Sequence, residues 1–379
     1  MSMYGIAAIP VLIWLYLLLG RGQFWRVAGH CAREVPTTAA RHVVVVIPAR
    51  NEAAVIGTAV AALACQTFNG LIEIIVIDDG STDGTADAAL AAARAAGALS
   101  RFTLLQGAAL PSGWTGKLWA LSQGVALAAD RGADYLLFSD ADTCHAPASV
   151  GALVTDAEVH RRDLVSRMVR LSTATLAERF LIPAFVFFFF KLYPPAWIAD
   201  PQRRLAAAAG GCILIRPKAL ARAGGLEAIR SQIIDDCALA RVVKKSGGRI
   251  SLELAEDTRS LRSYGSSAEI GAMIARTAFA QLRHSYLVLA ATLVGLFLTY
   301  LLPAVLLFSG DPVPVGLGLA ALLLMSLCYL PMVRFHGLSP LWSLCLPLIA
   351  IFYSGAVIQS AVQYARGSGG RWKGRIQDA

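Results

Sequence analysis

The sequence is poor in charged residues. Asp, Glu, Lys and Arg make up 16% of its 379 residues, whereas they make up about a quarter of an ordinary soluble protein. Hydrophobic residues account for 56%, and the excess lies at the two ends of the chain. An ordinary soluble protein is therefore excluded, and we expect lipid-facing ends around a soluble α/β domain of ordinary size.

The sequence also lacks paired cysteines and dense basic runs. Its seven cysteines are scattered and form no Cys-x-x-Cys pair, which argues against a disulfide framework or a zinc site and favours a reducing compartment. The formal net charge is +9, yet no Lys/Arg run is interleaved with aromatic residues, so nucleic acid is not expected as a partner. The charge suits an anionic membrane surface and anionic substrates.

No charged residue precedes the first apolar run, residues 3–19, whereas Arg21, Arg26 and Arg33 follow it. A cleaved signal peptide carries its positive charge in front of the apolar run. We therefore expect residues 1–21 to form a transmembrane anchor whose amino end is outside, with the following chain in the cytoplasm. The run is short for a span, so an interfacial anchor remains the alternative.

Apolar runs alternate with helical patterns from residue 41 onward. Strands are expected at 43–47, 72–77, 102–105 and 135–139, with further strands near 163–170 and 206–215. This alternation predicts an α/β domain with a Rossmann-like, mostly parallel sheet. Ligands of such sheets bind outside the carboxyl ends of the strands, so the loops there form the expected working edge.

Two carboxylates separated by one residue, Asp140 and Asp142, follow the strand expected at 135–139. Acids just past a strand end can hold a divalent metal against a phosphate. An Asp-rich turn that caps the next helix is the simpler interpretation, and the pair by itself leaves both open.

Another acid pair, Asp78 and Asp79, follows the strand expected at 72–77. Carboxylates there can accept hydrogen bonds from a base or a ribose. Asp79, Ser81 and Asp83 are also ordinary turn and N-cap residues, and we expect at least one of them only to cap.

Lys117 stands at the start of a helix expected to run to Ala129. Free N–H groups, the helix dipole and this lysine make a plausible phosphate site. The glycine spacing and the missing Ser or Thr after the lysine argue against a Walker motif.

Four segments together resemble a family-2 glycosyltransferase of GT-A fold. They are Val-Ile-Pro-Ala-Arg-Asn-Glu (46–52), Val-Ile-Asp-Asp-Gly-Ser-Thr-Asp-Gly-Thr (76–85), Gly-Lys-Leu-Trp-Ala-Leu (116–121) and Ser-Asp-Ala-Asp (139–142). The resemblance covers about residues 41–285 and implies an inverting enzyme that uses a nucleotide sugar. It implies a nucleotide-sugar pocket formed by Pro48, Arg50, Glu52, Asp78, Asp79, Lys117 and Asp140, and a site for Mg²⁺ or Mn²⁺ at Asp140 and Asp142 that neutralises the leaving diphosphate.

The resemblance also implies which residues lie on the acceptor side of the active site. Gly210 and Gly211 resemble the glycine pair near the acceptor and sugar pocket. Asp235 and Asp236, at the start of an expected helix, resemble the family's Glu-Asp motif, with Asp236 aligned with the catalytic base. Inversion needs such a carboxylate to take the acceptor's proton. Without the resemblance, an acid pair favoured by the helix dipole would be the preferred interpretation.

An amphipathic helix is expected over residues 269–284. Family members often carry a Gln/Arg-x-x-Arg-Trp element there, and this chain departs from it. Arg276 and Gln281 belong to the two partial matches and are the expected residues of the acceptor and sugar pocket. The departure argues against a processive polysaccharide synthase and favours transfer of a single sugar.

The remaining apolar segments are expected at or in the membrane. Residues 175–198 contain a phenylalanine-rich run, interrupted by Pro183 and too short to span a bilayer, so an interfacial segment is expected, with a core helix as the alternative. Membrane helices are expected within 286–365, at 287–308, 315–333 and 341–362. A basic tail, 366–379, follows them. Four spans would place it outside, against the positive-inside rule, so its side stays open.

A closer resemblance covers nearly the whole chain. The segments Gly-Trp-Thr-Gly-Lys-Leu-Trp-Ala (113–120) and Ile-Pro-Ala-Phe-Val-Phe-Phe-Phe (182–189) are most similar to the membrane glycosyltransferases associated with hopanoid biosynthesis, relatives of ceramide glucosyltransferases. It implies a multi-pass enzyme of a bacterial-type inner membrane, with a cytoplasmic catalytic domain and a lipid acceptor. A UDP-sugar donor is favoured. The alternatives are a polyprenyl-phosphate glycosyltransferase and a non-catalytic scaffold of a lipid-synthesis complex.

Overall fold

The computed structural model describes residues 3–27, 29–30, 40–372 and 375–376. It divides into two compact units, and each is described by itself. The sheet unit comprises Ala28–Ser172, Trp197–Arg262 and Lys373–Ala379, and the helical unit comprises Met1–Val27, Thr173–Ala196 and Ser263–Trp372. Arg33 and part of the expected basic tail lie outside the described residues.

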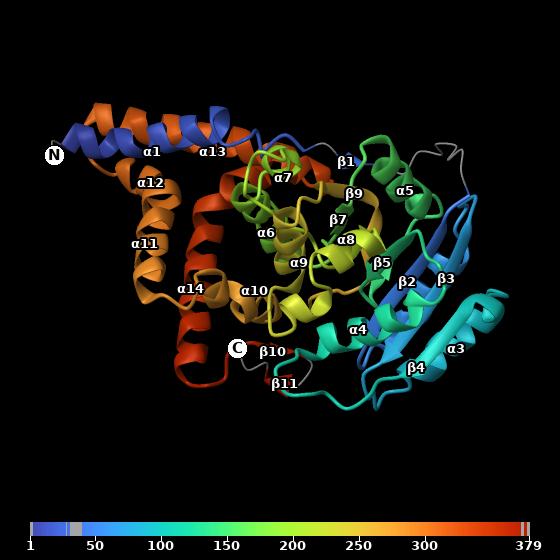
Figure 1. Cartoon of the computed structure of the whole chain (residues 1–379). Coiled ribbons are helices and arrows are strands. Elements are labelled where there is room, and N and C mark those ends of the chain that lie inside the picture. The colour runs from blue at the N-terminus through green and yellow to red at the C-terminus, as the bar shows by residue number, and fades with distance from the viewer. Residues whose placement is uncertain (1–2, 28, 31–39, 373–374, 377–379) are drawn as a thin grey trace. The chain divides into compact units, whose positions relative to one another are not determined.

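The sheet unit is built on a mixed, mostly parallel sheet of nine described strands (Figure 1). Their order is β1-β9-β7-β8-β5-β2-β3-β4, and β6 pairs with β9. The strands are β1 Gly29–His30, β2 His42–Ala49, β3 Leu71–Asp78, β4 Phe102–Gln106, β5 Tyr135–Ser139, β6 Thr143–Cys144, β7 Leu164–Arg170, β8 Cys212–Ile215 and β9 Ile250–Ser260. The predicted α/β class and mostly parallel sheet are confirmed.

Parallel pairing dominates the part of the sheet that was predicted from apolar runs. β2 lies between β3 and β5 and is parallel to both, and β3 is parallel to β4. Residues 43–49 of β2 are all buried, as expected of a strand covered on both faces. β8 runs antiparallel to both β5 and β7, so the sheet is mixed.

Helices cover the sheet within this unit. They are α2 Ala53–Ala64, α3 Thr85–Ala95, α4 Gly116–Ala129, α5 Ser149–Val159, α8 Pro217–Arg222 and α9 Asp235–Lys245, with short 3-10 turns η1 Leu99–Arg101 and η2 Leu226–Ile229. α4 packs closely on β2, because Gly124 has no side chain there. A Cβ at Gly124 would lie 2.3 Å from Cγ1 of Val46, well inside van der Waals contact.

The strand β9 was not predicted, because its sequence mixes apolar and charged residues. Its charges are compensated by distant parts of the chain. Glu253 forms an ion pair with Arg167 on β7, whose Nη2 lies 2.8 Å from Oδ2 of Asp156 on α5. Such long-range compensation cannot be read from the local pattern, which is why the strand was missed.

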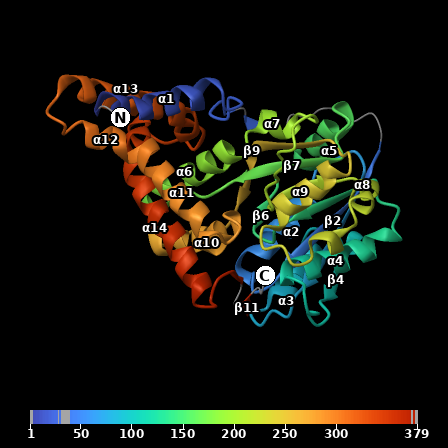
Figure 2. The ribbon, with the colours of Figure 1, turned by 60° about the vertical axis from the view of Figure 1, so that its left-hand side comes forward.

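The helical unit contains α1 Met3–Leu19, α6 Leu176–Leu192, α10 Ser267–Gln281, α11 Tyr286–Leu296, η3 Phe297–Leu301, α12 Leu302–Leu306, α13 Pro312–Phe335, η4 Pro340–Cys345 and α14 Leu346–Ala365. α7 Pro195–Ala199 follows α6 at the junction of the two units, and β10 Arg371–Trp372 and β11 Arg375–Ile376 follow α14. Within the helical unit α1 lies alongside α13, and α10 alongside α14 (Figures 1 and 2).

Four stretches of the described chain are long and apolar enough to cross a membrane: Leu176–Ala199, Tyr286–Leu306, Pro312–Phe335 and Pro340–Ala365. The last three correspond to the expected C-terminal membrane helices. α1 is a 17-residue helix, shorter than these, so its role as a membrane anchor stays a prediction.

The expectation that Pro183 interrupts the apolar run of residues 175–198, leaving it too short to span, was wrong. α6 continues through Pro183, and the 24-residue stretch Leu176–Ala199 has the length of a span. Packing explains the continuity: a proline inside a helix costs about 3 kcal/mol, and α6 buries Leu181, Ile182, Val186 and Phe187 around it. An interfacial position for this segment stays a prediction.

Candidate active site

Acidic residues gather at the carboxyl ends of neighbouring strands in the sheet unit. β3 ends at Asp78, and β5 ends at Ser139, directly before Asp140. β2 lies between them and pairs with both. The two acid pairs expected at strand ends therefore lie along one edge of the sheet, where ligands of α/β sheets bind.

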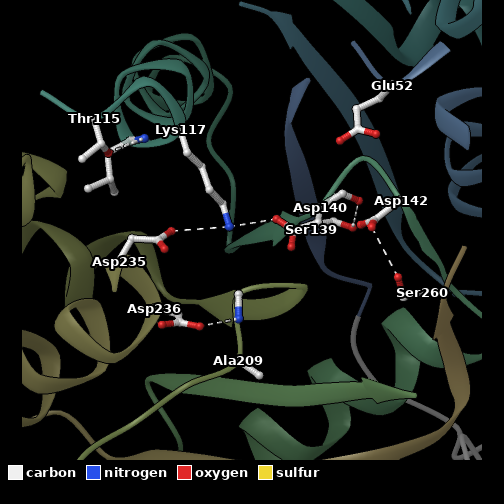
Figure 3. Close-up of polar contacts among 12 residues, drawn as sticks. Glu52, Thr115, Lys117, Ser139, Asp140, Asp142, Ala209, Asp235, Asp236 and Ser260 are labelled. Atoms are coloured by element: carbon white, nitrogen blue, oxygen red, sulfur yellow. Dashed lines mark hydrogen bonds and ion pairs between the residues drawn. The ribbon is translucent and has the colours of Figure 1, made fainter. Parts of the chain in front are cut away.

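Lys117 links the loop after β5 to the start of α9. It is the second residue of α4, and its Nζ lies 2.8 Å from Oδ1 of Asp140 and 3.5 Å from Oδ2 of Asp235 (Figure 3). Burial pulls the pKa of Lys117 down, but the carboxylates of Asp140 and Asp235 outweigh it and hold this pKa above its usual value. Burial also raises the pKa of Asp140, and the ammonium of Lys117 opposes that shift. The lysine is therefore charged and joins two acid pairs.

Asp236 is fixed by two backbone N–H groups. Gly210 donates to its Oδ2 at 2.9 Å, and Cys237 donates to its Oδ1 at 2.6 Å. Burial, and then the neighbouring charge of Asp235, raises the pKa of Asp236 to about 6. A carboxyl group with such a pKa is mostly ionised at neutral pH and is well matched to general base catalysis.

Gly210 lies close to two charged side chains of the site. A Cβ at this position would lie 3.1 Å from Nζ of Lys117 and 3.4 Å from Oδ2 of Asp236. The glycine expected near the acceptor and sugar pocket is thus the residue that lets the backbone approach both the lysine and the candidate base.

Asp142 is paired with an arginine that was not predicted. Nε of Arg262 donates to its Oδ2 at 2.9 Å, and the hydroxyl of Ser260 donates to the same oxygen at 3.3 Å. Nη2 of Arg262 also donates to Oε1 of Glu52 at 2.8 Å. Arg262 therefore joins two acids expected in the metal and nucleotide sites.

The sequence held no local signal for Arg262. The contact arises because β6 pairs antiparallel with the end of β9, so that Thr143 lies opposite Ser260. The pairing places the residues after β9 beside Asp142, whose carbonyl accepts a hydrogen bond from Leu261 N–H at 2.7 Å. Neither strand was predicted, so the arginine could not be placed either.

The loops after β2 and β3 are bonded to each other. Nη1 of Arg50 lies 3.8 Å from Oδ2 of Asp79 and also contacts the Asp79 carbonyl. Oδ1 of Asp78 accepts a hydrogen bond from Ser81 N–H at 3.0 Å, and the hydroxyl of Ser81 accepts one from Asn51 N–H at 3.0 Å. The structure thus brings together the expected nucleotide-pocket residues from these two loops.

The carboxylate of Asp83 lies at the start of two helices. Its carboxylate accepts hydrogen bonds from the backbone N–H groups of Ala53 at 3.0 Å and Thr85 at 3.1 Å, the first residues of α2 and α3. The residues at the N-cap positions are Glu52 and Gly84, so the expectation that at least one of Asp79, Ser81 and Asp83 only caps stays a prediction.

Two further expected residues, Pro48 and Gly211, lie in the sheet unit. Pro48 is a buried residue of β2, opposite Ile77. The carbonyl of Gly211 accepts a hydrogen bond from Asp140 N–H at 3.4 Å. Gly211 therefore contacts the loop that carries Asp140, and Pro48 lies in the strand beside β3.

The two expected residues from the departing motif, Arg276 and Gln281, lie on α10 in the helical unit. Nε2 of Gln281 donates to the hydroxyl of Tyr193 at 2.5 Å, and Arg276 is exposed. A role for either residue at the acceptor stays a prediction.

A buried histidine beneath the acid loop was also missed. Nε2 of His145 lies 2.9 Å from the hydroxyl of Ser139, and its Nδ1 lies 3.3 Å from the hydroxyl of Ser149. Burial lowers the pKa of His145 to about 4, so the ring is neutral and supports the residue that precedes Asp140.

The acids at β5 suit a metal ion that is shared with a ligand. The described residues contain no group of three or more His, Cys, Asp or Glu side chains arranged to hold an ion. Asp140 and Asp142 instead offer two carboxylates at a strand end, and Mg²⁺ is commonly bound by one or two carboxylates together with waters and substrate phosphates. The oxygen atoms of these two carboxylates are therefore suitable ligands for a hard divalent cation that binds together with a diphosphate.

A mostly parallel α/β sheet with acids after β3 and β5 and an acid pair on α9 is the arrangement expected of a domain of GT-A fold. Residues 44–222 match the family model described as glycosyl transferase family 2. This part of the chain matches that family, in agreement with the resemblance of its sequence motifs.

The chain is similar to several solved structures, and the first one named here shares its fold. The mannosyltransferase from Pyrobaculum calidifontis, solved with GDP-Man and Mn²⁺, is 18% identical with a TM-score of 0.55, and the match covers 96% of this chain and 99% of that chain. Glucosyl-3-phosphoglycerate synthase from Mycobacterium tuberculosis is 21% identical with a TM-score of 0.42, covering 65% and 82%. TarS from S. aureus is 19% identical with a TM-score of 0.42, covering 63% and 40%. No curated protein sequence matches the chain.

Proposed function

We propose that the protein is a membrane-bound inverting glycosyltransferase that moves a single sugar from a nucleotide sugar to a lipid acceptor, with hopanoid biosynthesis as its pathway. The observation that carries the proposal is the placement of Lys117 between Asp140 and Asp235. This contact joins a strand-end acid pair suited to a donor diphosphate to an acid pair suited to an acceptor. Both reactants of a transfer would thus meet in one site.

The donor would bind along the edge formed by the loops after β2, β3 and β5. Arg50, Glu52 and Asp79 would contact the nucleotide, with Pro48 and Asp78 shaping the pocket. Mg²⁺ or Mn²⁺ held by Asp140 and Asp142 would supply charge neutralisation for the departing diphosphate. The mannosyltransferase of the same fold was solved with GDP-Man and Mn²⁺, and the same class of donor is proposed here, with a UDP-sugar favoured.

Asp236 would act as the general base. The acceptor hydroxyl would attack the anomeric carbon from the face opposite the diphosphate, its proton would pass to the Asp236 carboxylate, and the bond to the diphosphate would break with inversion. The N–H groups of Gly210 and Cys237 hold this carboxylate. Asp235 would keep Lys117 charged beside the donor phosphates.

A lipid acceptor is supported by the apolar helices. Four stretches of the described chain are long and apolar enough to cross a membrane. A hydrophobic acceptor would lie in that membrane and reach the enzyme from it. The proposed location is a bacterial-type inner membrane, with the catalytic domain on the cytoplasmic side where nucleotide sugars are made.

The test is a transfer assay with the purified full-length protein in lipid vesicles. A panel of UDP- and GDP-sugars is combined with extracted hopanoids or polyprenyl phosphates, with EDTA controls, and lipid-linked sugar is measured. Metal-dependent transfer to a hopanoid is the expected result. Transfer only to polyprenyl phosphate would replace the hopanoid acceptor, and binding of donor without any transfer would favour a scaffold.

A further inference from the structure

Arg262 bridges two acids that belong to different parts of the proposed donor site. Its Nε lies 2.9 Å from Oδ2 of Asp142, and its Nη2 lies 2.8 Å from Oε1 of Glu52. The side chains of Asp142 and Glu52 are each 13% exposed, whereas that of Arg262 is 40% exposed. A partly exposed cation thus lies against two carboxylates that are mostly buried.

The backbone under this arginine is held independently of its side chain. Leu261 N–H donates to the carbonyl of Asp142 at 2.7 Å, and Arg262 N–H donates to the hydroxyl of Ser260 at 3.2 Å. The guanidinium can therefore leave the carboxylates by rotation of its own side chain, without unpairing β9 from β6.

The contacts of Arg262 coincide with those that a divalent cation would need. Nε of Arg262 and the hydroxyl of Ser260 already use Oδ2 of Asp142, so a cation that binds this oxygen would compete with the ion pair. The guanidinium is the more exposed partner in both ion pairs, so water can solvate it once a divalent cation has replaced it at Asp142. A guanidinium released beside a diphosphate has a matching partner, because its planar fork binds phosphate oxygens in pairs.

We propose that Arg262 is an exchangeable counter-ion. It holds Asp142 and Glu52 before the donor binds, and it moves to the diphosphate of the donor when a divalent cation occupies Asp142. This inference rests on the proposed function, because it requires a metal and a nucleoside diphosphate in the same site. It makes Arg262 a residue that both restrains metal binding and contacts the leaving group.

The proposal predicts effects of opposite sign in Arg262→Gln. Titration calorimetry of the full-length protein in detergent measures the affinity for Mn²⁺ alone, and then for UDP or GDP in the presence of Mn²⁺. Mn²⁺ alone should bind several-fold more tightly, because its competitor is gone. The nucleoside diphosphate should bind about tenfold or more weakly, because a charge-assisted hydrogen bond is lost. Arg222→Gln is the control: it removes an exposed arginine paired with Asp163 and should change neither affinity.

Arg262→Lys keeps the positive charge but lacks the planar guanidinium group that binds two oxygens at once. Mn²⁺ alone should therefore bind nearly as in the wild type, whereas the nucleoside diphosphate should bind more weakly. This variant also serves if the glutamine variant fails to fold. An unchanged diphosphate affinity in either variant, or a Mn²⁺ affinity of Arg262→Gln that is unchanged or weaker, would overturn the proposal. A wild-type protein that binds neither UDP nor GDP with Mn²⁺ would overturn the proposed function as well, so the two failures are distinguishable.

Discussion

Asp236→Asn tests the proposed chemistry most directly. The substitution nearly preserves the size of the side chain and removes the carboxylate that would take the acceptor's proton. General base catalysis contributes about 10²–10⁴-fold to a rate, so we expect turnover to fall by a factor in that range. Affinity for the nucleotide sugar should stay near the wild-type value, because Asp236 is bonded to Gly210 and Cys237 on the proposed acceptor side.

The raised pKa of Asp236 adds a dependence on pH. Burial, followed by the charge of Asp235, raises this pKa from 3.8 to about 6, and a base must be deprotonated. Wild-type turnover should therefore fall about tenfold for each pH unit below 6. The folded protein holds this proton more tightly than the unfolded chain, so ionisation destabilises the fold as pH rises from about 4 to about 6, by about 3 kcal/mol in total. The asparagine variant cannot ionise and should gain thermal stability relative to the wild type across this window.

The assay combines initial rates from pH 5 to pH 8 with thermal melts over a wider acidic range, on the full-length protein in lipid. Asp87→Asn is the control for turnover, because Asp87 is an exposed acid in the first turn of α3, and it should leave the rates and their pH dependence unchanged. Full turnover in Asp236→Asn would refute the role of a base and favour an acceptor that is already ionised. If the turnover of Asp236→Asn still falls below pH 6, a group other than Asp236 causes this pH dependence.

Three further changes probe the fold and the metal site. Gly124→Ala should lower the free energy of unfolding by about 1–3 kcal/mol, because its Cβ would lie 2.3 Å from Cγ1 of Val46. The control is Gly57→Ala, whose Cβ would make ordinary contacts at 3.6 Å and 3.7 Å; its melting temperature should be unchanged or higher. Burial lowers the pKa of His145 from 6.5 to about 4, so its protonation destabilises the fold as pH falls through this range, and His145→Gln should lose less melting temperature on acidification than the wild type. Asp142→Asn should weaken Mn²⁺ binding about tenfold or more in calorimetry, since a charged ligand is replaced by a neutral one.

Features encoded in short segments could be predicted from the sequence. β5 was expected at 135–139 and is found at Tyr135–Ser139, because a buried strand is a continuous apolar run and the acids after it end the run sharply. The same reasoning placed Asp78, Lys117 and Asp235 at element ends. The order of the four sequence motifs then indicated that these separate loops belong to one site. The hydrophobic periodicity alone could not indicate this.

Features that depend on tertiary contacts could not be predicted. β9 carries Glu253, whose charge is acceptable only because Arg167 meets it from β7. Arg262 reaches Asp142 only through the pairing of β6 with β9. The continuity of α6 through Pro183 likewise depends on neighbours that bury the helix. In each case a local rule was overridden by partners far away in the sequence.

The charge balance of the acid cluster gives a reason for a cation to accompany the donor. Three basic side chains pair with five carboxylates, and Asp236 adds another beside them; the pairs are Lys117 with Asp140 and Asp235, Arg262 with Glu52 and Asp142, and Arg50 with Asp79. A diphosphate entering this site would meet a surplus of negative charge, and two like charges 4 Å apart near a protein surface repel by about 4 kcal/mol. A divalent cation removes this repulsion. In calorimetry, UDP should therefore bind only when Mn²⁺ or Mg²⁺ is present. Uridine lacks the diphosphate and should bind equally with metal or with EDTA. Binding of UDP without metal would show that the surplus of negative charge in the site is already compensated.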